Sequence, residues 1–260
     1  GEPSAGLPPG AFVAFLQNHD QVGNRAFGER LTVLAPEAAR RAAVTALLLA
    51  PFPPLLFMGE EWGATTPFLY FCDVEPGLAR AVEEGRRREF ARFPEFSDPG
   101  QRERIPSPVA EETFRRCVLD WSEPERPAHR RWLDLHRRLL ALRREVLVPR
   151  LPARPIGGET LARQAVRFAW RLASGEDLVL HLNLGSDDVE GLAPAAARAL
   201  AVSAPGVEEA LGVGRLVAFS AAWHVIPASA QCPQGVAPDR PAVVDVPTAT
   251  YRLQMTSGFT

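Results

Sequence analysis

The feature that most constrains the fold of this chain is an unbroken apolar run, Ala11 to Leu16, which ends in a cluster of polar residues. A run without alternation is typical of a strand that is buried on both faces, as in parallel sheets covered by helices. Residues 17–20 follow it directly and are Gln, Asn, His and Asp. Four consecutive hydrogen-bonding side chains at a strand end predict a site for a polyhydroxylated ligand.

A second apolar segment predicts the neighbouring strand. Pro36 and Glu37 are expected to open a helix that Pro51 stops, and Leu55–Met58 then reads as a short strand that ends in Gly59–Trp62. Strand, helix and strand of these lengths form a βαβ unit, so the two strands should be parallel and linked by a right-handed crossover. Both polar strand ends would then face the same side of the sheet.

The rest of the chain predicts three further parts: an irregular insertion, a long helix and an antiparallel domain. Residues 63–127 predict an irregular insertion with one helical piece at 78–90, and we interpret its Arg86–Arg88 as a solvated face. A helix over 128–146 is expected to pack against the sheet through one apolar side, formed by Trp132, Leu135, Leu139, Leu142 and Val146. Beyond residue 150, alternation predicts an antiparallel domain: a hairpin over 166–184 and short strands at 197–203, 215–219 and 223–226. The expected division is 1–149 for the first domain, 150–227 for the antiparallel domain, 228–246 for a linker and 247–260 for a separate tail.

Composition excludes several classes of function. A net charge of −2 over 260 residues argues against a nucleic-acid surface, and no apolar stretch reaches the length needed to span a membrane. All 29 basic residues are arginine, which excludes a Schiff-base lysine and a Walker-A loop. The three scattered cysteines favour a reducing, cytoplasmic location. No ligands stand at metal-binding spacing, so we expect no metal and no cofactor.

Two motifs carry a resemblance to a known family. Phe15–Asp20 resembles the seventh-strand motif of the α-amylase family of glycoside hydrolases, and Leu55–Trp62 resembles the eighth strand. The longer stretches 18–26, 66–71, 85–90 and 119–121 resemble those members that release trehalose from maltooligosyltrehalose. The resemblance implies an α/β fold, the C-terminal part of a (β/α)8 TIM barrel followed by a small antiparallel β-domain. It also implies hydrolysis, with retention, of the α-1,4 bond between trehalose and a maltooligosaccharide, in trehalose biosynthesis.

The resemblance assigns roles to individual residues. Asp20 matches the family's third carboxylate, which stabilises positive charge on the sugar in the transition state. Retaining glycosidases also need a nucleophile and a general acid, and the family carries them on the fourth and fifth strands. Those strands would precede Gly1, so we expect the isolated chain to be inactive. We also expect both ends to be cut, because the first residue is not methionine and residues 251–255 resemble the opening of a strand. The predicted substrate-binding residues are His19, Gln21, Val22, Gly23, Asn24, Glu60 and Trp62.

Other interpretations stay open. Asp20 could serve a turn, Glu60 could pair with an arginine, and Trp62 is more readily explained as core than as a sugar platform. Asp20 could also form a catalytic pair with Glu60 or Glu61. The parent enzyme could be a branching enzyme or an α-glucosidase, or the chain could be a non-catalytic carbohydrate-binding fragment. Residues 246–254 resemble the start of malto-oligosyltrehalose synthase, so a fusion to that enzyme is expected.

Overall fold

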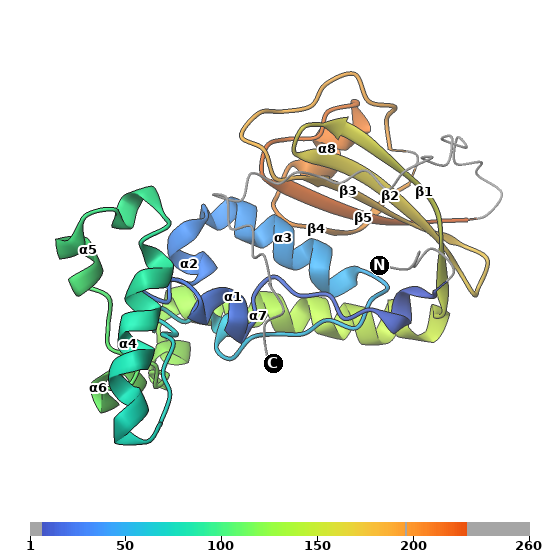
Figure 1. The fold of residues 1–260 in the computed structure, drawn as a ribbon. Coiled ribbons are helices and arrows are strands. Elements are labelled where there is room, and N and C mark those ends of the chain that lie inside the picture. Colours follow the sequence, from blue (N-terminus) through green and yellow to red (C-terminus); the bar gives the residue numbers. More distant parts are fainter. Residues whose placement is uncertain (1–6, 196, 228–260) are drawn as a thin grey trace.

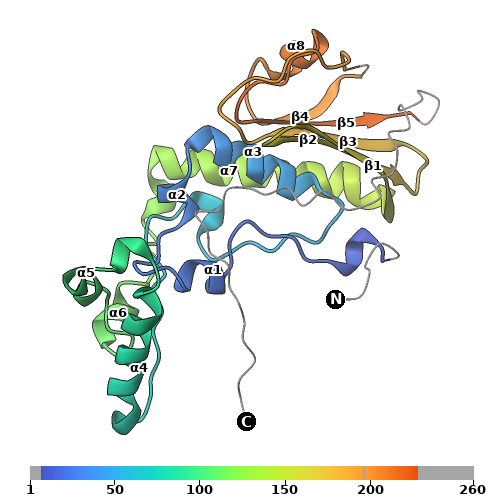
Figure 2. The ribbon, with the colours of Figure 1, turned by 45° about the horizontal axis from the view of Figure 1, so that its top comes forward.

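The computed structural model describes residues 7–195 and 197–227, and these form stacked layers (Figures 1 and 2). A five-stranded antiparallel sheet covers two helices, α3 (Glu37–Leu49) and α7 (Pro127–Leu142). The extended segments near residues 11–16 and 51–58 lie on the other side of these helices, and the helices between residues 76 and 115 form a lobe away from the sheet. The expected linker, 228–246, and tail, 247–260, lie outside the described residues.

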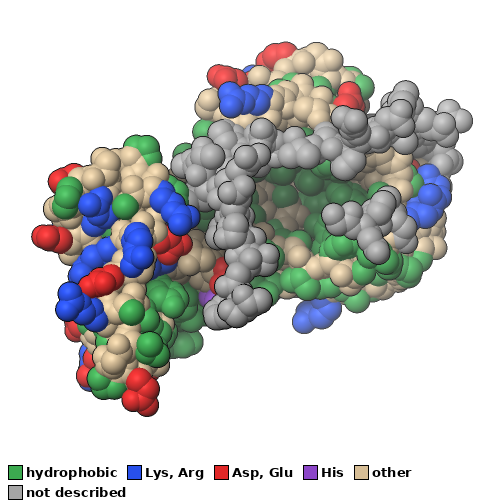
Figure 3. All heavy atoms as spheres, viewed as in Figure 1, with side chains coloured by type: hydrophobic (Ala, Val, Ile, Leu, Met, Phe, Trp, Pro, Cys, Tyr) green, Lys and Arg blue, Asp and Glu red, His purple; other side chains and the backbone are tan. Residues whose placement is uncertain are grey.

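The two segments predicted as neighbouring parallel strands run parallel to each other, but neither forms a regular strand. The Ala14 amide donates to the Pro53 carbonyl (3.0 Å), the Leu55 amide donates to the Ala14 carbonyl (2.8 Å), and Ala14 and Pro54 form one parallel bridge. The expectation of a run buried on both faces is wrong, because Val13 is 57% exposed. A strand inside a parallel sheet has a hydrogen-bonded neighbour on each side. Among the described residues, the first segment pairs on one side only, through the bridge between Ala14 and Pro54. Figure 3 shows apolar side chains gathered over the middle of this face of the molecule.

The helices of the βαβ unit follow the sequence signals. Helix α3 begins directly after Pro36, with Glu37 in its first turn, and ends at Leu49 before Pro51. Helix α7 buries Trp132, Leu135 and Leu139, as the spacing predicted, and continues into a π-helical turn at Arg143–Leu147. It packs on α3 and on the 3-10 turn Glu60–Trp62. The helix was expected to pack against the parallel strands, and in the structure it contacts the turn that follows the second extended segment, while α3 makes the contacts with the antiparallel sheet.

The insertion contains more helix than the single piece predicted. Helix α4 spans Pro76–Phe90, and its N-terminal proline and Arg87 and Arg88 in the last turn suit its two ends. The shorter helices of residues 7–150 are α1 (His19–Gly23), α2 (Leu31–Leu34), α5 (Pro99–Glu103) and α6 (Glu111–Arg115), with further 3-10 turns at Pro9–Ala11, Pro94–Phe96, Glu123–Glu125 and Val148–Arg150.

The antiparallel sheet confirms the predicted hairpin. Its strands are β1 (Ala153–Ala162), β2 (Ala165–Leu172), β3 (Asp177–Asn183), β4 (Ala199–Val202) and β5 (Ser220–Ile226), in the order β1-β2-β3-β5-β4. The strand expected at 215–219 is wrong, because only Leu216 bridges, to Val189, before the chain turns at Phe219. Strand β1 and helix α8 (Val207–Gly212) were not predicted, since Gly157 and Gly158 interrupt the alternation in β1 and α8 is short.

The largest hydrophobic cluster joins the helices to the sheet. Leu48 of α3, Leu139 of α7, Leu178 of β3 and Trp223 of β5 all belong to it, and each is at most 1% exposed. The Trp223 indole donates to the Thr45 carbonyl of α3 at 2.9 Å, which satisfies its polar atom in the core. The boundary between the two expected domains stays a prediction.

Among the described residues, no helix has the length and apolar character needed to cross a bilayer.

Candidate active site

The candidate anion, Asp20, lies on the short helix α1 at the surface. Asn18 caps this helix, because its side-chain oxygen accepts from the Gln21 amide at 2.8 Å. His19 Nε2 lies 3.2 Å from Asp20 Oδ1, and the two side chains are 72% and 70% exposed. A carboxylate and an imidazole held side by side and open to solvent can both hydrogen-bond the hydroxyl groups of a sugar. Asp20 also suits the first turn of a helix, so the turn interpretation is compatible with the same geometry.

A hydrogen bond joins the two ends of the segment that contains α1. Gln17 precedes the helix, and its side-chain oxygen accepts from the Leu31 amide at 2.8 Å. We call residues 17–31 the site loop. Gly28 adopts a φ of +62° and accepts from the Phe68 amide at 3.0 Å, and a Cβ at Gly28 would meet the Phe68 carbonyl oxygen at 2.4 Å. Glycine is therefore required at this position, and the site loop is fixed to the chain that follows Gly63.

Arg86 holds the site loop from the insertion. It is 8% exposed, and its Nη2 donates to the carbonyl of Gly23 at 2.7 Å and to that of Arg25 at 3.3 Å. Its guanidinium also stacks over the rings of Tyr70 and Phe90, with centroid distances of 4.9 and 4.6 Å. The interpretation of this run as a solvated face is wrong for Arg86, although Arg88 is exposed. The helical period of α4 would have suggested it, since Arg86 and Phe90 are four residues apart on one side.

Glu60 lies behind the loop rather than beside Asp20. It is 7% exposed, and its Oε2 accepts from the Phe57 amide at 3.1 Å. Burial raises the pKa of Glu60 from its ordinary value of 4.5 to about 7, while the Phe57 amide, the Gln17 side chain and the Arg30 charge oppose the rise. Arg30 is 2% exposed and donates from Nη1 to the Met58 carbonyl at 2.8 Å. Arg30 therefore ties the end of the site loop to the turn after the second extended segment, and the charge of Arg30 acts on Glu60 within that turn.

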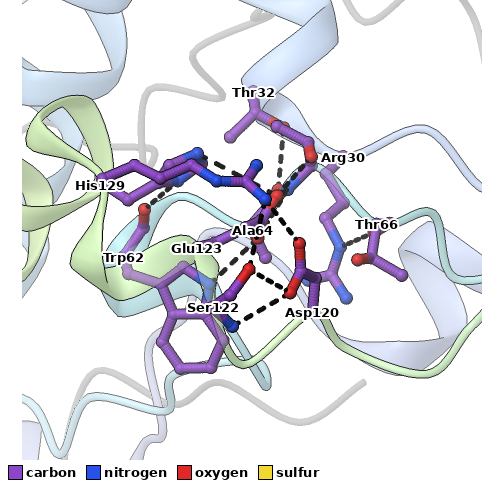
Figure 4. Close-up of polar contacts among 11 residues, drawn as sticks. Arg30, Thr32, Trp62, Ala64, Thr66, Asp120, Ser122, Glu123 and His129 are labelled. Carbon is purple, nitrogen blue, oxygen red and sulfur yellow. Dashed lines mark hydrogen bonds and ion pairs between the residues drawn. The ribbon is translucent and has the colours of Figure 1, made fainter.

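Trp62 belongs to a buried polar network around Glu123 (Figure 4). Trp62 is 4% exposed, and its indole donates to Glu123 Oε2 at 3.2 Å. The Thr65 amide and hydroxyl both donate to the same carboxylate, and His129 Nδ1 lies 2.9 Å from the Trp62 carbonyl oxygen. A tryptophan that is packed and hydrogen-bonded in this way has no free ring face in the structure, which favours the core interpretation of Trp62 over sugar stacking.

An apolar groove adjoins α1. It measures about 290 Å³, and its lining residues are Met58, Phe68, Phe71, Phe114, Cys117, Val118, Leu119 and Trp121. Phe68 connects it to the site loop, because a Cβ on Gly23 would lie 3.5 Å from the Phe68 ring. Trp121 is 73% exposed, with its ring 5.3 Å from that of Trp62. Exposed Trp121 was not among the predicted site residues, although aromatic rings that remain exposed are the kind that sugars stack on.

The structure thus brings the predicted residues into two places. His19, Asp20 and Gln21 are exposed on α1, Val22 and Gly23 are buried beneath them, and Asn24 is half-buried at the helix end. Glu60 and Trp62 are buried behind the site loop. Asp20 lines neither the apolar groove nor the small cavity beside Glu60. The assigned substrate-binding roles remain predictions. The sequence included Gln17 in the polar run but did not predict its bond to the Leu31 amide, nor the buried contacts of Arg30, Arg86 and Glu123.

Comparison with solved structures defines the class of this fold. An enzyme solved as a putative α-amylase from Salmonella typhimurium superposes with a TM-score of 0.74 and 38% identity, over 86% of this chain and 36% of that one. The catalytic module of a multi-modular glycogen-degrading pneumococcal virulence factor has the same fold at 16% identity, with a TM-score of 0.51 over 87% of this chain and 37% of its own. The structural neighbours are α-amylase-family barrel enzymes, and the chain has the fold of part of such an enzyme, with its antiparallel domain.

Curated relatives narrow the likeness to one kind of enzyme. The chain is 47% identical over 154 residues to the malto-oligosyltrehalose trehalohydrolase of Arthrobacter ramosus, which covers 59% of this chain. It is 47% identical over 145 residues, or 56% of the chain, to the enzyme of that name from Deinococcus radiodurans. The chain spans about a quarter of these relatives, 26% and 24% of their lengths. No family model matches it.

Proposed function

We propose that this chain is the C-terminal part of a retaining α-glycosidase that cleaves the α-1,4 bond between trehalose and a maltooligosaccharide. The observation that carries the proposal is the 47% identity to trehalohydrolases over more than half of the chain. The exposed pair His19 and Asp20, at the polar end of the first extended segment, supports it, because chemistry in barrel enzymes is built at that end of the strands.

Asp20 would act on the sugar ring, not as the nucleophile. As an anion it accepts hydrogen bonds from hydroxyl groups beside the reacting carbon, and these bonds strengthen as positive charge grows on the ring. His19 would bind the same sugar, and Gln21 and Asn24 the neighbouring one. Glu60 is an unsuitable catalytic partner for Asp20, since it is buried against the Phe57 amide while Asp20 is open to solvent. The nucleophile and general acid are then supplied by residues outside this chain.

A chimera tests this activity. The stretch of the Deinococcus radiodurans trehalohydrolase that matches this chain is replaced by the residues of this chain, and products from maltooligosyltrehalose are separated by chromatography. The proposal predicts release of free trehalose. The isolated 260-residue chain, assayed in parallel, should release none. Transfer of glucan chains by the chimera would instead support a branching enzyme, and release of glucose alone would support an α-glucosidase.

We further propose that residues 246–254 open a second enzyme that is fused to the first, a malto-oligosyltrehalose synthase, and that the protein works in the cytoplasm on α-glucans. The sequence resemblance of that stretch supports the fusion. Sequencing the transcript beyond codon 260 tests it: an open reading frame that continues into a synthase supports the fusion, and a stop codon directly after Thr260 opposes it.

A further inference from the structure

A small cavity lies between the site loop and the turn that follows the second extended segment. Its volume is about 20 Å³, and Gln17, Arg30 and Glu60 line it together with Arg40 and Val44 of helix α3. A cavity of ~10–15 Å³ is large enough for one water molecule, provided that polar groups face it. This cavity therefore has room for one water and little else.

Two polar atoms beside the cavity lack partners among the residues that the structure describes. They are Glu60 Oε1 and Arg30 Nη2, on side chains that are 7% and 2% exposed. The remaining polar atoms of both groups are engaged, for example Glu60 Oε2 with the Phe57 amide and Arg30 Nε with the Thr66 carbonyl at 2.5 Å. A buried acceptor and a buried donor left unpaired both cost free energy, so a guest that satisfies both is favoured.

The opposite charges of Arg30 and Glu60 determine which kind of molecule the cavity can bind. A cation would be repelled by Arg30, an anion by Glu60, and an apolar molecule would leave both atoms unpaired. Water accepts from the guanidinium and donates to Glu60 Oε1, which is an acceptor in the protonated and in the ionised carboxyl group. We propose that this cavity binds one water molecule that bridges Glu60 and Arg30, and that Glu60 is thereby a positioning residue for the site loop.

The geometry of the loop explains why such a bridge would matter. Gln17 and Arg30 stand at the two ends of the site loop, and both line the cavity. The Leu31 amide donates to Gln17 Oε1, so the two ends are also tied to each other. The benefit to sugar-binding residues rests on the proposed function, whereas the water and its link to the loop do not.

The ionisation of Glu60 gives the bridge a pH dependence. The charged groups around it are Arg30 and Arg40, which line the cavity with it, and Glu61 on the same turn. The charge of Glu123 acts on Arg30. Burial raises the pKa of Glu60 from 4.5 to about 7 in the folded chain. Between pH 4.5 and 7 the folded state then binds more protons than the unfolded state. The contribution of protonated Glu60 to the free energy of unfolding is therefore full below pH 4.5 and is lost as the pH rises through 7.

Urea unfolding between pH 5 and 8 tests the ionisation, with Glu60→Gln as the variant and Glu61→Gln as the matched control. Relative to Glu60→Gln, the unfolding constant of the wild type should rise by up to about tenfold per pH unit between pH 5 and 7. The Glu61→Gln chain should keep the transition, at a slightly lower pH, because the charge of Glu61 adds to the rise of the Glu60 pKa. Parallel pH profiles for the wild type and Glu60→Gln would overturn the pH dependence.

A crystal structure of the chain at pH 5, where Glu60 is protonated, tests the water itself. The expected result is one ordered water within hydrogen-bond distance of Glu60 Oε1 and Arg30 Nη2. A direct hydrogen bond between the two side chains, or an empty cavity, would overturn the bridge.

Hydrogen exchange at the Leu31 amide tests positioning. Its protection in the wild type should fall, with a midpoint near pH 7, and Glu60→Gln should remove this transition while Glu61→Gln keeps it. Unchanged protection across this range in the wild type would refute a positioning role. Absence of maltotriose binding would count against the proposed function alone, because the water and the Leu31 readout do not depend on it.

Discussion

Glu123 shows how one buried side chain organises the chain behind the site loop. The carboxylate is 1% exposed and accepts from the Trp62 indole and from the amide and hydroxyl of Thr65. Its segment is more than fifty residues away from both donors in sequence, so a single acceptor fixes the turn after Gly59 against the start of α7 (Figure 4).

Replacing Glu123 with glutamine should be costly despite the similar shape. A side-chain NH2 group would then face donors, and the hydrogen bonds to a charged acceptor would be lost. We expect a loss of roughly 2–4 kcal/mol in the free energy of unfolding, since a hydrogen bond to a charged group contributes about 1.5–3 kcal/mol. Urea unfolding measures it, and Glu125→Gln, an exposed change in the same turn, is the control. Equal stability of the two variants would contradict the role of the network.

Individual residues also show which parts of the candidate site could be predicted from the sequence and which could not. Local patterns identified the polar run that contains His19 and Asp20, because those residues are consecutive. The contacts of Arg86 with Gly23 and of Glu123 with Trp62 join residues about sixty positions apart, and no local pattern encodes them. The burial of Trp62, by contrast, matches the interpretation that a large aromatic residue belongs to the core.

At the scale of elements, the site loop depends on its backbone conformation at Gly28. Gly28→Ala would place a Cβ 2.4 Å from the Phe68 carbonyl oxygen at a φ of +62°. We expect the variant to lose about 2–4 kcal/mol of stability, since strain at such positions costs about 1–3 kcal/mol and the clash adds to it.

The matched control for this change is Gly85→Ala in the interior of α4. A Cβ there meets nothing within 4 Å, so alanine should be neutral or stabilise by up to about 1 kcal/mol. Thermal unfolding followed by circular dichroism compares the two variants. If Gly28→Ala were as stable as Gly85→Ala, the site loop would not be held as the structure shows it.

Elements with strong local signals were predicted well. Proline and acid at the start of α3, and the three- and four-residue spacing in α7, determine those helices locally. The extended segments were predicted as full strands because apolar runs indicate burial, yet burial of a strand depends on partners that its own sequence does not contain. The irregular strand β1 and the short helix α8 were missed for lack of such signals.

At the scale of the whole molecule, the helices and the sheet share one core. Trp223 on β5 is fully buried and reaches the Thr45 carbonyl of α3. We therefore expect α3, α7 and the sheet to unfold in one transition, and Trp223→Phe to shift that transition by about 1–3 kcal/mol through the lost hydrogen bond and the smaller ring. Tryptophan fluorescence and far-ultraviolet circular dichroism, measured in the same urea series, should coincide. Two separated transitions would show that residues 1–149 and 150–227 are independent domains.

The account as a whole depends on the contact between Asp20 and the substrate. In the Deinococcus radiodurans chimera, Asp20→Asn should lower the kcat for trehalose release by at least about 100-fold, because preorganised electrostatic groups contribute on that scale to the transition state. Asp134→Asn, an exposed carboxylate on α7, should leave kcat unchanged. An Asp20→Asn chimera that folds and releases trehalose at the unmodified rate would contradict the assignment of Asp20.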